Sequence, residues 1–173
     1  MRRPHIKKFT AALITSALAL SLTACSGAGP NAETRMIKRV TDGNEAVVKT
    51  NGNDLSISNF LLVATEDGSA VVVGTLVNYA DESDTLLGIS AGGISAVITG
   101  EQNLVKNQPI RFEGDSANAK AVFSGVGAQP GINIPVELAF ARAGVVKISA
   151  IIRDKRDDYA GVTTGAKLAT EAK

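Results

Sequence analysis

Cys25, the single cysteine of this 173-residue chain, is the residue whose surroundings most clearly predict a chemical modification. It ends the stretch Leu22-Thr23-Ala24-Cys25, which is typical of a lipobox, the motif at which a cysteine receives diacylglycerol and becomes the first mature residue. An apolar run, Phe9–Leu22, leads into the motif, and four basic residues precede the run: Arg2, Arg3, Lys7 and Lys8. This order is that of a secretory signal. We therefore predict lipidation at Cys25.

The predicted lipid determines where the protein would reside. The apolar run has roughly 14 residues, fewer than the ~18 that a membrane-spanning helix needs. One acyl chain binds a membrane only marginally, whereas two or more hold a protein stably, and the lipoprotein modification supplies at least two. The sequence thus predicts a protein held through Cys25 at the extracytoplasmic face of the cell membrane. The alternative is a signal anchor that stays uncleaved, with Cys25 as an ordinary thiol.

The export route is predicted from the first few residues. Arg2-Arg3 is compatible with twin-arginine export, but Pro4 and His5 follow where such signals carry a polar residue and then apolar ones. We therefore favour the general secretory route.

The remaining side chains offer little for catalysis or for binding transition metals. His5, the single histidine, lies in the predicted signal, and Cys25 is consumed by the lipid, so the mature chain carries neither imidazole nor free thiolate. This inventory excludes histidine-based triads, cysteine nucleophiles and most transition-metal sites. We predict a protein that is not an enzyme, with no catalytic residues, no metal ligands and no cofactor.

Two clusters of charged residues could form sites of another kind. Asp81, Glu82 and Asp84 lie together, which predicts a solvated turn, with a calcium site as the alternative because carboxylates suit hard cations. Asp154–Asp158 is predicted to be a solvated tail, with a docking motif for a partner as the alternative.

The charge balance argues against nucleic acid as a partner. Removal of the signal takes away four of the 18 basic residues and none of the 17 acidic ones, so the net charge changes from +1 to −3. A slightly acidic domain binds nucleic acid or anionic lipid poorly.

Composition divides the chain into four segments. Residues 1–24 are predicted to be the lipoprotein signal peptide, and residues 25–43 the lipidated cysteine with a flexible tether of small and polar residues. Residues 44–153 carry strand patterns and form the folded domain. Residues 154–173 lose the apolar pattern and are predicted to be a disordered tail.

Residues 44–153 have the pattern of about nine short strands separated by turn residues, of which Asn51-Gly52 is the clearest. Pro109 interrupts one segment and places it at a sheet edge. Short strands at this spacing favour an all-β sandwich or barrel of half-buried antiparallel strands. The predicted strands are Glu45–Thr50, Asp54–Thr65, Ser69–Tyr79, Thr85–Ser90, Ile94–Thr99, Leu104–Glu113, Lys120–Val126, Asn133–Ala141 and Val145–Arg153.

The stretch Asn78–Ser90, NYADESDTLLGIS, resembles a signature of the periplasmic copper-chaperone family PCuAC. In that signature a strand ends in Asn, a short loop leads to an Asp, and a strand with the pattern L-x-G-x-S follows. Ile57–Phe60 resembles the first core strand of the family, and Val136–Phe140 with Ala143–Val146 resembles its closing hairpin. The resemblance spans Asn53–Arg153 and implies a cupredoxin-like or immunoglobulin-like antiparallel β-sandwich.

The same resemblance implies copper ligands that this chain lacks. The family binds Cu(I) with two His and two Met, and its second His-x-Met pair falls on Lys120 and Val122 here. The first pair would lie between Ile94 and Lys106, where neither residue type occurs, and Met36 lies in the tether. Because Cu(I) prefers soft donors, the copper site is predicted to be missing.

A lipobox joined to a PCuAC-like domain without copper ligands is similar to the LpqE-like lipoproteins of actinobacteria. That resemblance implies an accessory lipoprotein on the outer face of the cytochrome bcc–aa3 oxidase supercomplex. The prediction is therefore a non-catalytic interaction module on a membrane protein complex. The alternative is an extracytoplasmic protein that binds copper or another ligand at a relocated site.

Overall fold

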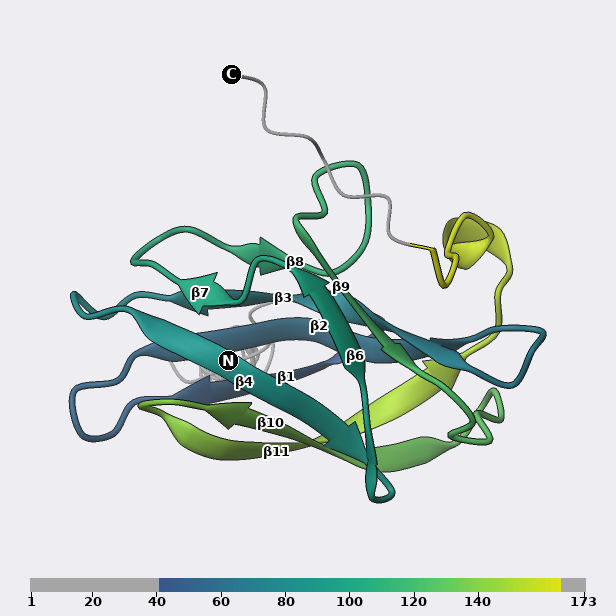
Figure 1. The fold of residues 1–173 in the computed structure, drawn as a ribbon, viewed down its shortest axis with the longest axis horizontal. Coiled ribbons are helices and arrows are strands. Elements are labelled where there is room, and N and C mark those ends of the chain that lie inside the picture. Colours follow the sequence, from purple (N-terminus) through teal and green to yellow (C-terminus); the bar gives the residue numbers. More distant parts are fainter. Residues whose placement is uncertain (1–40, 166–173) are drawn as a thin grey trace, which may run out of the picture. The chain divides into compact units, whose positions relative to one another are not determined.

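The structure is a computed structural model that describes residues 41–165, and these form β-strands and one short 3-10 turn (Figure 1). The all-β prediction is therefore confirmed for the described chain. The predicted signal peptide and most of the tether lie outside the described residues. The strands are β1 (Asn44–Val48), β2 (Leu55–Ala64), β3 (Ala70–Asn78), β4 (Asp84–Ala91), β5 (Ile94–Ser95), β6 (Val97–Gly100), β7 (Asn103–Leu104), β8 (Ile110–Arg111), β9 (Ala119–Phe123), β10 (Asn133–Phe140) and β11 (Gly144–Arg153).

The strands follow one another in the order β5-β4-β10-β11-β2-β3-β9-β6. Only Ala96 separates β5 from β6, so the two ends of this order are joined by the chain itself. β1 pairs with β2, β7 with β4 and β8 with β3. The result is a two-layered sandwich whose sides are closed, with β4, β10 and β11 facing β2, β3 and β9 (Figure 1).

One strand pair departs from the predicted antiparallel arrangement. β11 and β2 are parallel and pair through Ile152 with Leu62 and Arg153 with Val63, whereas the other pairs of named strands are antiparallel. This short parallel contact joins the last strand to the second and makes the sheet mixed.

Two predicted strands are divided in the structure because each changes its pairing partner midway. The predicted strand Ile94–Thr99 becomes β5, which pairs with β4, and β6, which pairs with β9. The predicted strand Leu104–Glu113 becomes β7, paired with β4, and β8, paired with β3. Between β7 and β8, Asn107 adopts a φ of 59°, in the left-handed region, and turns the chain.

A bulge in β2 changes which of its side chains face the main core. Asn59 has a φ of 51°, and the β2–β3 register shifts between Ser58 and Leu61. Backbone packing here requires Gly43, since a Cβ at this position would lie 2.4 Å from the carbonyl carbon of Asn59. Gly43 N also donates a hydrogen bond to Asn59 Oδ1 at 2.9 Å. The first segment of the described chain is thereby fixed against β2.

The main core lies between the two layers. Alternate residues of β10, namely Val136, Leu138 and Phe140, are buried there, as the period-two pattern predicts. Phe60, Phe112 and Phe123 are fully buried in the same cluster. A second, smaller cluster lies on the outer face of β2 and β3 and contains Leu61, Val63, Val71 and Val162.

The second cluster corrects the prediction that the tail is disordered from residue 154. Asp157–Tyr159 forms a 3-10 turn, and Val162 is only 5% exposed, packed against Leu61, Val63 and Val71. Two apolar residues suffice to hold this segment because the outer face of β2 and β3 is itself apolar. Residues 166–173 lie outside the described chain.

Candidate functional site

Three residues of the chemical inventory lie outside the described part of the chain: Cys25, His5 and Met36. Lipidation at Cys25 therefore stays a prediction. Within residues 41–165 no helix is long and apolar enough to cross a membrane.

Asn78, the first residue of the PCuAC-like stretch, organises the loop that follows β3. Its side chain is 3% exposed, and Nδ2 donates hydrogen bonds to Glu82 O at 2.7 Å and Leu104 O at 3.0 Å. Its Oδ1 accepts a hydrogen bond from Ala80 N at 3.0 Å. A buried amide that satisfies three backbone groups is structural, and it joins the β3–β4 loop to β7.

Asp84 has a similar role at the start of β4 and is not part of a solvated turn as predicted. It is 5% exposed, and Oδ1 accepts hydrogen bonds from Thr85 N at 2.7 Å and Arg142 N at 2.8 Å. Oδ2 accepts one from Ala143 N at 2.9 Å. Asp84 thus binds the turn of the β10–β11 hairpin, because a carboxylate accepts strong hydrogen bonds from peptide N–H groups.

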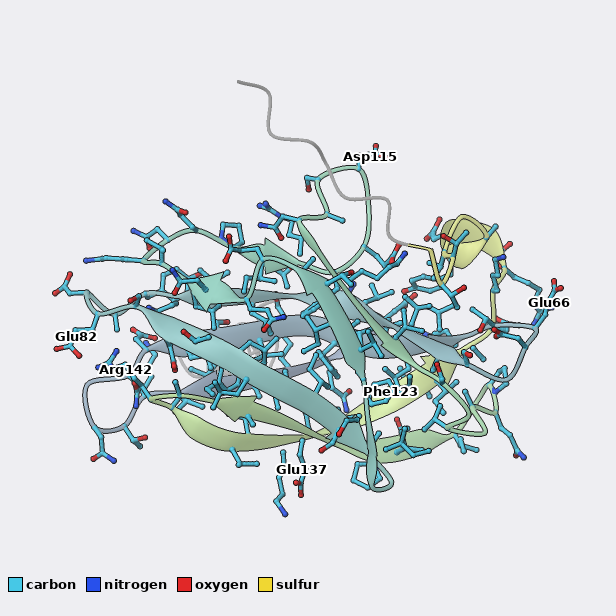
Figure 2. The ribbon with its side chains drawn as sticks, in the orientation of Figure 1. Glu66, Glu82, Asp115, Phe123, Glu137 and Arg142 are labelled. Atoms are coloured by element: carbon cyan, nitrogen blue, oxygen red, sulfur yellow. The ribbon has the colours of Figure 1, made fainter. Side chains whose placement is uncertain are left out.

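The other two acidic residues of this cluster are exposed and point to separate partners. Asp81 pairs with Lys106, and this hydrogen bond lowers the pKa of the Asp81 carboxyl. Glu82 Oε2 lies 2.6 Å from Arg142 Nη2, and Figure 2 shows both residues at one end of the domain. Among residues 41–165 no group of three or more His, Cys, Asp or Glu side chains could hold a metal ion. The calcium alternative therefore finds no support in the described structure.

Lys120 and Val122, the positions implied for the second His-x-Met pair, both lie on the outer side of β9. Ala119, Ala121 and Phe123 alternate with them and are buried in the main core. Val122 packs at the margin of the second cluster.

Lys120 is 4% exposed, and its Nζ lies 2.7 Å from Glu113 Oε1. Among the described residues Glu113 Oε1 accepts no well-directed hydrogen bond, so the contact is that of two close charges. Burying such a pair costs desolvation free energy that the attraction must offset.

The Lys120–Glu113 pair borders an open cavity of about 580 Å³ beneath the C-terminal segment. Val73 contributes to one side of the cavity, and Asp158, Tyr159 and Val162 contribute to another. Burial raises the pKa of Tyr159 to about 12, with a further contribution from its hydrogen bond to Asp42. The sequence singled out Lys120 as an implied ligand position. It gave no sign of Glu113 or Tyr159, because neither belongs to a recognisable motif.

Comparison with known proteins identifies the fold. No family model matches the sequence, and no curated protein matches it. Among solved structures, the apo PCuAC domain from PmoF1 is similar, with a TM-score of 0.53 and 24% identity over 64% of this chain and 99% of that one.

The copper-bound PCuAC domain from PmoF2 gives a TM-score of 0.54 at 20% identity, over 64% of this chain and 98% of that one. The apo form of that domain gives 0.52 at 18% identity. At these identities the likeness concerns the fold, and over 64% of its length this chain has the fold of a PCuAC domain.

Proposed function

We propose that this protein is a lipid-anchored, non-catalytic accessory subunit on the extracytoplasmic face of a membrane protein complex. The cytochrome bcc–aa3 supercomplex is the first candidate partner. The lipobox at Cys25 supports the anchor and the compartment, and the LpqE-like resemblance supports the choice of complex. The PCuAC-like fold supports an extracytoplasmic domain.

The Lys120–Glu113 ion pair is the observation that best supports a role other than that of a copper chaperone. At the positions implied for copper ligands, this chain has an ammonium group and an apolar side chain. An ammonium group repels a metal cation and offers it no lone pair, whereas Cu(I) needs thioether, thiolate or imidazole donors. We infer that the fold serves here for contacts with protein.

Co-purification tests this proposal directly. The full chain, tagged at its C-terminus, would be extracted from membranes in mild detergent and its partners identified by mass spectrometry. We expect subunits of one membrane complex, those of the cytochrome bcc–aa3 supercomplex first, at near-stoichiometric amounts. The control is an equally tagged lipoprotein of the same membrane. Recovery of the bait alone under several detergents would contradict the accessory-subunit proposal.

A second candidate function is the binding of copper or another ligand at a relocated site. The similarity to a copper-bound PCuAC domain favours it, since that solved structure carries copper on the same fold. Because Lys120 and Val122 offer copper no donor, this function requires donor side chains elsewhere in the chain. A copper titration distinguishes it from the first proposal.

A further inference from the structure

Residues 157–163, which we name the strap, cross the outer face of the sheet without joining it. The backbone hydrogen bonds in this region are local: Tyr159 N donates to Arg156 O, Ala160 N to Asp157 O, and Val162 N to Tyr159 O, at 2.9 to 3.1 Å. No strand pairing involves the strap in the described structure. Side chains must therefore hold it in place.

Two side-chain attachments hold the strap. Val162 is 5% exposed and packs on Leu61, Val63 and Val71. The Tyr159 ring packs against the same cluster, and its Oη donates a hydrogen bond to Asp42 Oδ2 at 3.1 Å.

Asp42 ties the strap to the segment that enters the domain. Its Oδ1 lies 3.3 Å from Arg153 Nη2, at the end of β11, while its Oδ2 holds Tyr159. Only Gly43 separates Asp42 from β1, so the contact joins the chain before the first described strand to the chain after the last one.

The strap borders the cavity that contains the buried ion pair. Asp158, Tyr159 and Val162 line that cavity together with Lys120 and Glu113. Lys120 is 4% exposed, so solvent reaches its ammonium group poorly in this structure.

We propose that the strap opens as a unit before the sheet unfolds, that it gates access to the Lys120–Glu113 ion pair, and that Asp42 is its latch. Segments with few buried contacts and no ladder hydrogen bonds open more often than the sheet that carries them. One buried valine, one partly buried tyrosine ring and one hydrogen bond hold this segment, whereas β2 and β3 are held by a strand ladder and two clusters. A change at Asp42 would then alter access to Lys120.

Amide hydrogen exchange of the full chain in detergent tests the opening. In the wild type, the amides of Tyr159, Ala160 and Val162 should share one rate of opening, faster than that of β2. Val162→Ala should raise their exchange about tenfold, because the truncation removes contacts that only the closed strap makes. The amides of β2 should stay slower than those of the strap, since their exchange requires the sheet itself to open. The matched control is Val136→Ala in the main core, which should lower protection of the sheet and leave strap exchange unchanged.

Variants at the latch test the role of Asp42. Asp42→Asn should raise strap exchange about two- to fivefold, since it weakens an exposed, charge-assisted contact. Asp54→Asn, which removes the exposed contact with Lys49 Nζ at 3.4 Å, is the matched control and should leave the strap unchanged.

Chemical labelling tests the gating. Acetylation of Lys120 by a water-soluble acetylating ester, followed by mass spectrometry, should be slow in the wild type and about tenfold faster in Val162→Ala. Lys49, whose side chain is 68% exposed, serves as the reference and should react equally in both proteins. Strap amides that exchange only together with β2 would overturn the proposal. So would Lys120 labelling that stays unchanged while strap exchange rises.

Discussion

At the scale of residues, the acidic side chains of the β3–β4 loop differ sharply in what they do. Asp84 accepts three backbone hydrogen bonds from two segments, whereas Asp81 is 91% exposed and pairs only with Lys106. The sequence shows these carboxylates side by side. It does not show that Arg142 and Ala143 lie next to one of them, because that contact depends on the hairpin more than 50 residues later.

Replacing Asp84 with Asn should lower the free energy of unfolding by about 2 kcal/mol, because charge-assisted hydrogen bonds to buried groups are worth ~1.5–3 kcal/mol. The amide keeps one acceptor oxygen for three N–H donors and adds a donor of its own. Urea unfolding followed by circular dichroism measures the change. Asp81→Asn is the control and should unfold like the wild type, and equal losses in both variants would contradict the role assigned to Asp84.

From the residues at the implied copper-ligand positions, we predict that the mature protein does not compete with a chelator for Cu(I). Lys120 pairs with Glu113, and Val122 packs on apolar neighbours, so neither offers a soft donor. Titration of the protein against a chromophoric Cu(I) chelator should leave the copper on the chelator. Stoichiometric withdrawal of copper from the chelator would contradict the accessory-subunit proposal and favour the ligand-binding alternative.

At the scale of elements, the long strands could be predicted from sequence. The points at which two predicted strands divide, and the strap, could not. β2, β3, β4, β10 and β11 fall within about two residues of their predicted bounds, because each is a long run of strand-forming residues bounded by turn residues. The predicted strands around Ala96 and Pro109 divide because they pass from one layer to the other, which is a tertiary effect. The strap has only Tyr159 and Val162 as large apolar residues, too few to give a periodic signal.

The strap should detach at high pH. Its tyrosine, Tyr159, has a pKa of about 12 in the folded protein against a reference value of 10.0, so the neutral phenol is favoured by folding. The stability that this phenol contributes is therefore complete below pH 10 and is lost as the pH rises from 10 to 12. Absorbance titration at the tyrosinate band, wild type minus Tyr159→Phe, should show a midpoint near 12. A midpoint at 10 would show that the phenol is free.

At the scale of the whole molecule, Cys25 is predicted to decide where the domain resides. A Cys25→Ala variant should be neither lipidated nor retained by membranes, because two or more acyl chains are what hold such a protein stably. Fractionation under high salt with metabolic labelling by a fatty acid measures both. A variant that still sediments with membranes would point to an uncleaved signal or to anchoring by protein contacts alone.

The parallel contact between β2 and β11 has a consequence for how the chain matures. Leu62 and Ile152 are about 90 positions apart, so the sheet closes only when nearly the whole domain has been synthesised, and folds with such distant pairings form slowly. During synthesis, a nascent chain that lacks β11 leaves Leu62 and Val63 without their partners and the β10 edge open. Export by the predicted signal would benefit from slow closure, because the chain would stay unfolded until it had been translocated. The same slow closure would expose the unfinished domain to chaperones and proteases until its last strand arrives.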